Sequence, residues 1–234
     1  MKNQKISLYR CLAIVALILF IDQFLKIYIK LNFPLSIYGQ EAIFDIGWFK
    51  LLFIENKGMA WGAQINDFIP FLTEKSGKLF LTLFRIIAIG FIFYWLKKTI
   101  SENSSKLFSI SLSLILAGAI GNVIDSVFYG YIFTESYFQV ASFAPGEGYS
   151  SIFYGNVVDM FQFPIATWTW PSFLPWVGGD EFTFFEPVFN IADSAISIGI
   201  FIMLVFNGSF FKENWKFFLG SHNNLILYLF HQYF

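Results

Sequence analysis

The chain has 234 residues, of which 56% are hydrophobic and only 13% are charged. A soluble domain of this size carries about 25% charged residues, so much of the surface must face something other than water, and a membrane is the ready explanation. The formal net charge of -1 gives no indication of nucleic-acid binding, and the single cysteine, Cys11, excludes an internal disulfide bond.

Four apolar stretches are long enough to cross the hydrocarbon core of a bilayer as helices. They lie near residues 8–29, 79–96, 107–128 and 188–207. Prolines and a Gly-Gly pair interrupt the aromatic stretch near 161–177, so we expect it to form a loop at the membrane interface. The predicted fold is therefore mainly α, a polytopic membrane protein with a single membrane domain over residues 1–208 and a tail over 209–234.

Two long segments, 30–78 and 129–187, connect these spans. The first alternates apolar and polar residues and carries Gly and Asn turn signals, which predicts a small β-sheet at the membrane surface. The second is long, rich in aromatic residues and free of lysine and arginine. Basic residues gather instead in both terminal tails and in the 97–106 turn, so the positive-inside rule predicts cytoplasmic termini and two outer segments.

Three acidic residues lie within the predicted spans, where charges are costly and usually functional. Asp22 belongs to the first span, Asp125 lies near the outer end of the third, and Asp193 lies just inside the fourth. The predicted topology brings them to a similar depth near the outer surface. A fourth acid, Asp159, lies in an apolar run of the second outer segment, which we expect to dip towards the membrane.

Polar residues accompany these acids at helical spacing. Asn122 precedes Asp125 by three residues, and Asn190 precedes Asp193 by three. Residues i and i+3 share a helix face, so we expect each carboxylate to have a neutral amide donor beside it. Lys26 follows Asp22 by one turn, and a local ion pair is a sufficient explanation for both.

Few chemistries fit this set of residues. Both histidines, His222 and His231, lie in the C-terminal tail, and Cys11 lies near the opposite face, which leaves no usual zinc ligand at the outer site. No serine-nucleophile motif of the GxSxG or SxxK type is present. Two close carboxylates remain, one ionised to deprotonate water and one protonated to donate to a carbonyl oxygen. This chemistry needs no metal and no other cofactor.

Five motifs occur in a fixed order along the chain. They are Asp22–Lys26, Glu55–Gly62, Gly118–Asp125, Val157–Met160 and Phe189–Asp193. Together they resemble the motifs of lipoprotein signal peptidases, the signal peptidase II family, over roughly residues 8–207.

The resemblance implies a role for each motif. Asp159 and Asp193 match the catalytic pair of an aspartic endopeptidase. The residues that match substrate-binding positions are Asn56, Gly58, Asn122, Asp125 and Asn190. Asp22 and Lys26 match a structural motif.

The resemblance also implies a substrate and a location. The substrate is a prolipoprotein whose cysteine carries diacylglycerol, the cut falls just before that cysteine, and the enzyme contacts membrane lipid. The cyclic peptide globomycin is the expected inhibitor. The expected location is the bacterial cytoplasmic (inner) membrane, with several passes, cytoplasmic termini and an active site on the periplasmic side.

The chain departs from the family pattern at one residue of the site. Ser126 follows Asp125 where the family often has arginine. Arg85 is a candidate to replace that cation, and a structural ion pair is the alternative. Neither the length of the 129–187 segment nor the 209–234 tail has an assigned role.

Three other kinds of protein are alternatives. A proton-coupled transporter would use membrane carboxylates as a relay, but it would spread them across the bilayer and usually has two related halves, and no repeat is evident. An assembly or anchoring protein would explain the aromatic segment but not Asn190 beside Asp193. A presenilin-type protease would carry Tyr-Asp and Gly-x-Gly-Asp motifs, and neither occurs.

Overall fold

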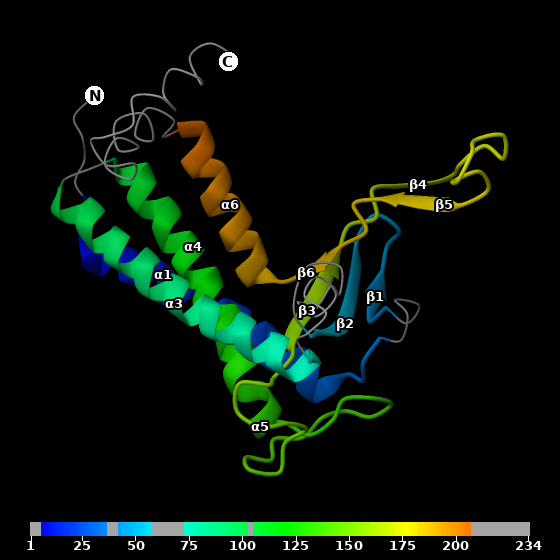
Figure 1. Cartoon of the computed structure of the whole chain (residues 1–234), viewed down its shortest axis with the longest axis horizontal. Helices are drawn as coiled ribbons and strands as arrows, with labels where there is room; N and C mark the ends of the chain where they lie inside the picture. The colour runs from blue at the N-terminus through cyan, green and yellow to red at the C-terminus, as the bar shows by residue number, and fades with distance from the viewer. Residues whose placement is uncertain (1–5, 37–41, 58–72, 103–104, 207–234) are drawn as a thin grey trace.

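A computed structural model describes residues 6–36, 42–57, 73–102 and 105–206. Its main helices are α1 (Leu8–Asn32), α3 (Glu74–Ser101), α4 (Lys106–Ile124) and α6 (Ile191–Phe206), which form a bundle (Figure 1). α4 packs against the other three. It continues into a five-residue π-helical turn, η3 (Asp125–Tyr129), and a short helix, α5 (Gly130–Ile132). Widened turns of this kind often occur at functional sites.

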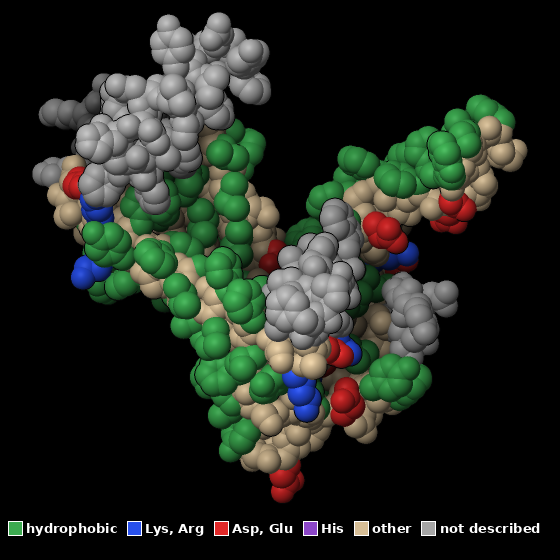
Figure 2. Space-filling model, in the orientation of Figure 1, with side chains coloured by type: hydrophobic (Ala, Val, Ile, Leu, Met, Phe, Trp, Pro, Cys, Tyr) green, Lys and Arg blue, Asp and Glu red, His purple; other side chains and the backbone are tan. Residues whose placement is uncertain are grey.

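The helices present hydrophobic residues to their surroundings. Three of them, Leu8–Asn32, Glu74–Ser101 and the continuous stretch Lys106–Ile132, are long and apolar enough to cross a membrane. Hydrophobic side chains cover the visible face of the bundle (Figure 2). α6 is apolar as well, but its described part has 16 residues and is shorter than a usual span. Three of the four predicted spans are therefore supported by length and composition, and the fourth stays a prediction.

A four-stranded antiparallel sheet lies at one end of the bundle, which we call the sheet end (Figure 1). Its strands follow the order β1 (Phe44–Asp45), β2 (Lys50–Asn56), β3 (Val157–Gln162) and β6 (Val188–Phe189). The sheet predicted within 30–78 is confirmed as β1 and β2. The sequence did not indicate β3, because Val157–Met160 is buried on both faces and such a strand lacks the alternation of a half-exposed one.

A second pair of strands forms a separate hairpin from β4 (Ala166–Thr169) and β5 (Glu181–Phe184). Pro164 and Pro171 lie just outside β4, where a missing backbone N–H removes no ladder hydrogen bond. The expectation of a loop near 161–177 is thus partly wrong. No helix forms there, as predicted, but Ala166–Thr169 is a strand that pairs with a partner beyond the predicted loop.

Two clusters of buried residues hold the described parts together. The first lies within the bundle and includes Cys11, Val15, Leu96, Phe108, Leu112, Leu116, Ala117 and Met203. The second joins α1, β2, β3 and the end of the third membrane helix, through Ile29, Phe53, Tyr129, Phe133, Val158 and Met160. Close packing of this kind transmits position from one element to the next. The second cluster therefore fixes the sheet, and Asp159 with it, against the helix ends.

Candidate active site

Asp193 lies in the first turn of α6, and Asn190 is the residue that caps this helix. The backbone N–H of Asp193 donates to Oδ1 of Asn190 across 2.9 Å, and the backbone N–H of Asn190 donates to Oδ2 of Asp193 across 3.3 Å. This reciprocal pair is a capping box with Asp in the place of the usual Glu or Gln. The prediction that Asn190 lies beside Asp193 is confirmed, and the cap accounts for their spacing of three residues. The prediction that the side-chain amide of Asn190 donates to Asp193 is wrong, because this amide donates to Asp159.

Asp159 lies on β3, on the same face of the sheet as Asn56. In the β2–β3 register Asp159 opposes Ile54, and Asn56 follows Ile54 by two residues, so the two polar side chains are diagonal neighbours. Nδ2 of Asn56 donates to Oδ2 of Asp159 across 3.1 Å. The other carboxylate oxygen, Oδ1, accepts a hydrogen bond from Nδ2 of Asn190 across 2.7 Å.

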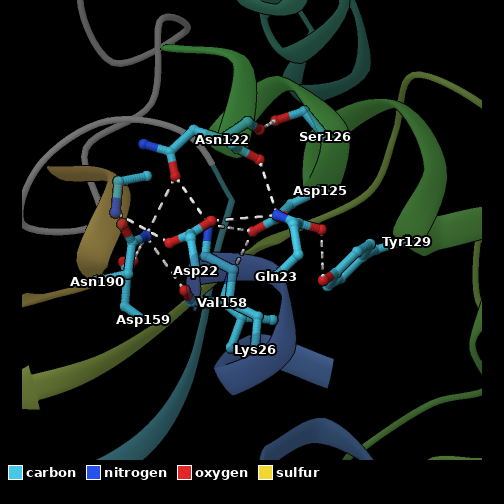
Figure 3. A network of polar contacts seen from close by, with 12 residues as sticks. Asp22, Gln23, Lys26, Asn122, Asp125, Ser126, Tyr129, Val158, Asp159 and Asn190 are labelled. Atoms are coloured by element: carbon cyan, nitrogen blue, oxygen red, sulfur yellow. Dashed lines mark hydrogen bonds and ion pairs between the residues drawn. The ribbon is translucent and has the colours of Figure 1, made fainter. Parts of the chain in front are cut away.

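Asn190 therefore joins the two aspartates from two elements of the fold. Its side-chain nitrogen donates to Asp159, and its oxygen and backbone nitrogen bind Asp193. Asn122 on α4 completes the link, because its Nδ2 donates to Oδ1 of Asp193 across 2.7 Å. Figure 3 shows Asp159 and the two asparagines converging at the start of α6.

The environment of Asp159 favours the protonated carboxyl group. Its residue surface is only 3% exposed, and its pKa is raised from 3.8 to about 7. Burial is the largest cause of the raised pKa, followed by the negative charge of Asp193. Three weaker influences lower the pKa: the hydrogen bond from Asn56, the charge of Lys26 and the hydrogen bond from Asn190. Desolvation beside a second carboxylate is the arrangement that keeps one proton on a pair of acids.

A second group of charges lies behind this pair and is fully buried. Nζ of Lys26 is 2.9 Å from Oδ2 of Asp22 and 2.8 Å from Oδ2 of Asp125. The predicted ion pair between Asp22 and Lys26 is confirmed, and Asp125 is its third member. A buried charge that loses its partner is strongly destabilising, so these three residues depend on one another.

Both acids of this group also bind backbone beside the first pair. Oδ1 of Asp22 accepts from the N–H of Ala192 across 2.9 Å, and Ala192 precedes Asp193. Oδ2 of Asp125 accepts from the N–H of Val158 across 3.2 Å, and Val158 precedes Asp159. The cluster of Asp22, Lys26 and Asp125 thus holds the two elements that carry Asp159 and Asp193.

The amide that donates to Asp125 does not belong to Asn122, the residue that the sequence predicted. Asn122 and Asp125 both face Lys26, to which their oxygen atoms bind at 3.1 and 2.8 Å, so the amide nitrogen of Asn122 turns to Asp193 instead. The donor to Asp125 is Nε2 of Gln23, 2.9 Å from Oδ1. The pairing of Asn122 with Asp125 as donor and acceptor was therefore wrong.

Sequence reasoning gave Gln23 no role, although it lies between two of the acids. Besides Asp125, its Nε2 contacts Oδ2 of Asp22 at 3.1 Å, and its Oε1 accepts from the hydroxyl of Tyr129 across 3.0 Å. The only signal was its place directly after Asp22 in the first motif.

A third polar group, which the sequence did not predict, lies beside Asn56. It includes Glu55, the residue directly before Asn56 in the chain. Oε1 of Glu55 binds the buried Nζ of Lys30, and Oε2 accepts from Nδ2 of Asn156 across 2.9 Å. Lys30 follows Asp22 and Lys26 at intervals of four residues along α1, and this repeat on one helix face was the available signal. The contacts attach the end of β2 to α1 and to the segment that precedes β3.

Arg85 approaches the site from α3. Its Nη1 is 3.5 Å from Oγ of Ser126, and Asp193 is the acid whose charge acts on it most strongly, followed by Asp159 and Asp125. Arg85 thus lies beside Ser126, which occupies the position where the family often has arginine. Gly58 and the 209–234 tail lie outside the described residues.

The contacts define a class of protein: a helical membrane protein in which asparagine side chains hydrogen-bond a buried carboxylate, Asp159, and a partly buried one, Asp193, at one end of its bundle. Comparisons with known proteins identify the family within this class. Residues 14–208 match the family model described as signal peptidase (SPase) II. The chain therefore belongs to the signal peptidase II family, and it is a peptidase of the membrane.

Individual relatives agree with this assignment. A lipoprotein signal peptidase from Porphyromonas gingivalis is 47% identical over 195 residues, which cover 82% of this chain and 80% of that protein. One from Amoebophilus asiaticus is 36% identical over 204 residues, covering 87% of this chain and 78% of the relative. A solved structure described as a bacterial membrane enzyme has a similar fold, with a TM-score of 0.54 and 22% identity over 88% of this chain and 91% of the other.

Proposed function

We propose that this protein removes the signal peptide from prolipoproteins, cutting just before a cysteine that carries diacylglycerol. Two findings support the proposal. The chain belongs to the signal peptidase II family, and its relatives are lipoprotein signal peptidases. Two aspartates predicted to be catalytic, Asp159 and Asp193, bind the same side chain, that of Asn190. A proton-coupled transporter, the main alternative, accounts for neither finding.

The proposed mechanism is that of an aspartic endopeptidase. The Asp193 carboxylate accepts a proton from a water molecule as the water oxygen attacks the scissile carbonyl carbon. The protonated Asp159 donates its proton to the carbonyl oxygen, which gives a neutral tetrahedral intermediate. When the carbon–nitrogen bond breaks, the proton held by Asp193 passes to the departing amine of the cysteine, and Asp159 recovers its proton from the intermediate. The raised pKa of Asp159, about 7, supports its assignment as the acid.

The remaining site residues divide into two proposed groups. Asn56, Asn122, Asn190 and Asp125 would bind substrate or shape the site around it, as would Gly58. Asp22 and Lys26 would be structural. The hydrogen bond of Asp22 to the backbone of α6 and the ion pairs of Lys26 with Asp22 and Asp125 support this role. Arg85 would supply the cation that Ser126 does not, because it contacts Ser126 and its positive charge acts on both aspartates. No cofactor enters the proposed reaction.

The site would open on the periplasmic side of the bacterial inner membrane, where the diacylglyceryl chains remain in lipid while the peptide reaches the aspartates. The aspartates lie at the sheet end, whereas the start of α1 and the end of α6 lie at the opposite end (Figure 1). This arrangement supports cytoplasmic termini, as the distribution of basic residues predicts.

A direct assay tests the proposal. The purified full-length protein is incubated in detergent with a prolipoprotein that carries diacylglyceryl cysteine and, in parallel, with the unmodified prolipoprotein. Mass spectrometry should show a mature product that begins at the lipidated cysteine, from the modified substrate alone, and globomycin should block its formation. Cleavage at another bond, equal cleavage of the unmodified substrate, or no cleavage would contradict the proposal.

A further inference from the structure

The β4–β5 hairpin and the loop that joins its strands form an arm that extends away from the bundle (Figures 1 and 2). All four residues of β4 and three of the four residues of β5 are exposed. The described part of the protein therefore covers neither face of this arm. An isolated two-stranded hairpin is marginally stable in water.

The register of the arm separates its side chains onto two chemically different faces. Directly opposed residues share a face, and successive residues alternate between faces. The apolar face carries the pairs Trp168↔Phe182 and Ala166↔Phe184. The polar face carries the pairs Thr167↔Thr183 and Thr169↔Glu181. The arm is thus amphipathic over its whole strand length.

Aromatic rings cluster on the apolar face and extend it towards the tip. The Trp168 ring lies 4.8 Å from the Phe182 ring, and the Trp170 ring lies 5.7 Å from the Trp168 ring. In the loop beyond them, Phe173 is 81% exposed and Trp176 is 96% exposed. A contiguous exposed apolar surface of this kind marks an interaction site in a stable protein.

The charge and the place of the arm identify what covers it. The 129–187 segment contains no lysine or arginine, and its acids Asp180, Glu181 and Glu186 lie on or beside the arm. Trp is enriched at the polar–apolar boundary of a bilayer, and Phe accompanies Trp on the inserted face of segments that lie there. Only residues 185–190 separate the end of β5 from the start of α6. The base of the arm is therefore close to the level at which α6 joins the apolar bundle.

From these features we infer that the arm lies on the membrane surface beside the bundle. The Trp168–Phe182 face inserts into the interfacial layer of the lipid, and the threonine face remains in water. Binding is driven by apolar burial and not by charge, so it does not require anionic lipid. The inference depends on the membrane location of the chain and is independent of its peptidase activity.

Spin labels on neighbouring residues of β4 test this inference in the full-length protein. Trp168→Cys places a nitroxide on the apolar face and Thr169→Cys places one on the polar face; Cys11 is buried, so the parent chain is the labelling blank. The protein is studied in nanodiscs of phosphatidylcholine, with and without phosphatidylglycerol. The label at 168 should collide several-fold more often with oxygen than with a water-soluble nickel complex, the label at 169 should show the reverse, and both should be insensitive to phosphatidylglycerol.

Other outcomes would overturn the inference. Equal access of the nickel complex to both labels would place the whole arm in water. Protection at 168 that requires two protein copies per disc would make the arm a dimer contact, and protection that requires added prolipoprotein would make it a substrate contact. Phe182→Cys with Thr183→Cys repeats the comparison on β5 if a β4 variant does not fold. None of these measurements requires the protein to cleave a prolipoprotein.

Discussion

Asn190 donates its side-chain amide to Oδ1 of Asp159 across 2.7 Å, while the oxygen of the same side chain accepts from the N–H of Asp193 and so caps α6. One residue therefore sets the start of α6 and the position of β3 at once. The amide has no charge of its own, so it orients the carboxylate of Asp159 while adding only a modest preference for its ionised form.

Replacing Asn190 separates its two roles. Asn190→Ala removes both the helix cap and the donor to Asp159, so we expect the free energy of unfolding to fall by about 1 kcal/mol and cleavage to fall too. Asn190→Ser keeps an oxygen that can cap the helix but has no amide to reach Asp159. It should retain the parent melting temperature yet lose cleavage by about tenfold or more. Asp159 becomes ionised as it gives up its proton, and a hydrogen bond to a charged group contributes about 1.5–3 kcal/mol.

Thermal melting in detergent and kcat/KM on the lipidated substrate check this prediction. Equal activity of the Ser variant and the parent protein would show that the contact with Asp159 is unimportant for the reaction.

The rate should fall as the pH rises through the pKa of Asp159, about 7, because the proposed acid must carry its proton. The hydrogen bond from Asn56 lowers this pKa, so Asn56→Ala should raise it and move the alkaline limb of kcat/KM to higher pH. Asp45→Asn is the matched control, since Asp45 is exposed on β1. An alkaline limb that stays in place, or moves to lower pH, in the Asn56 variant would exclude Asp159 as the group that titrates.

Removing Lys26 should destabilise the protein more than any change at its surface. Lys26→Met leaves Asp22 and Asp125 as two buried, unpaired carboxylates, and breaking a buried ion pair in this way costs about 3–5 kcal/mol. Adding Asp22→Asn and Asp125→Asn to the same chain removes both charges and should restore much of the melting temperature. A Lys26→Met protein as stable as the parent would show that the triad is not structural.

Arg85→Gln should move the acidic limb of the pH–rate profile to higher pH. The positive charge of Arg85 acts on Asp193 and Asp159, and the loss of a positive charge disfavours the ionised form of a nearby carboxyl group. Arg85→Lys keeps the charge and should shift the limb less. If both variants lose stability but keep the parent profile, Arg85 is a structural ion-pair partner and not the replacement for the cation missing at Ser126.

Local relationships were the predictable part of this site. Asp22 with Lys26, and Asn190 with Asp193, are set by helix and cap spacing, which a sequence displays directly. The contact of Asn56 with Asp159 depends on the register of β2 against β3, which joins residues about a hundred positions apart, and no local pattern encodes that register. Gln23 was missed for the same reason, because two of its partners, Asp125 and Tyr129, lie on the third membrane helix.

The boundaries of the helices show a similar limit. Hydropathy predicted 79–96 for the second span, whereas α3 runs over Glu74–Ser101. Hydropathy reports the apolar length that fits the bilayer, while the polar turns at both ends continue the helix beyond it. Thr73 fixes the true start, because its side chain accepts from the N–H of Ser76 across 3.2 Å.

The most direct measurement of the central claim is the rate of a single turnover by Asp159→Asn and Asp193→Asn proteins, each shown to be inserted and to melt like the parent. If these two carboxyl groups carry out the reaction, either substitution should lower the rate by about 10³-fold or more, since each removes a proton-transfer group. Asp45→Asn, assayed beside them, should leave it unchanged. A rate within about tenfold of the parent in either variant would contradict the assignment of this pair as the catalytic groups.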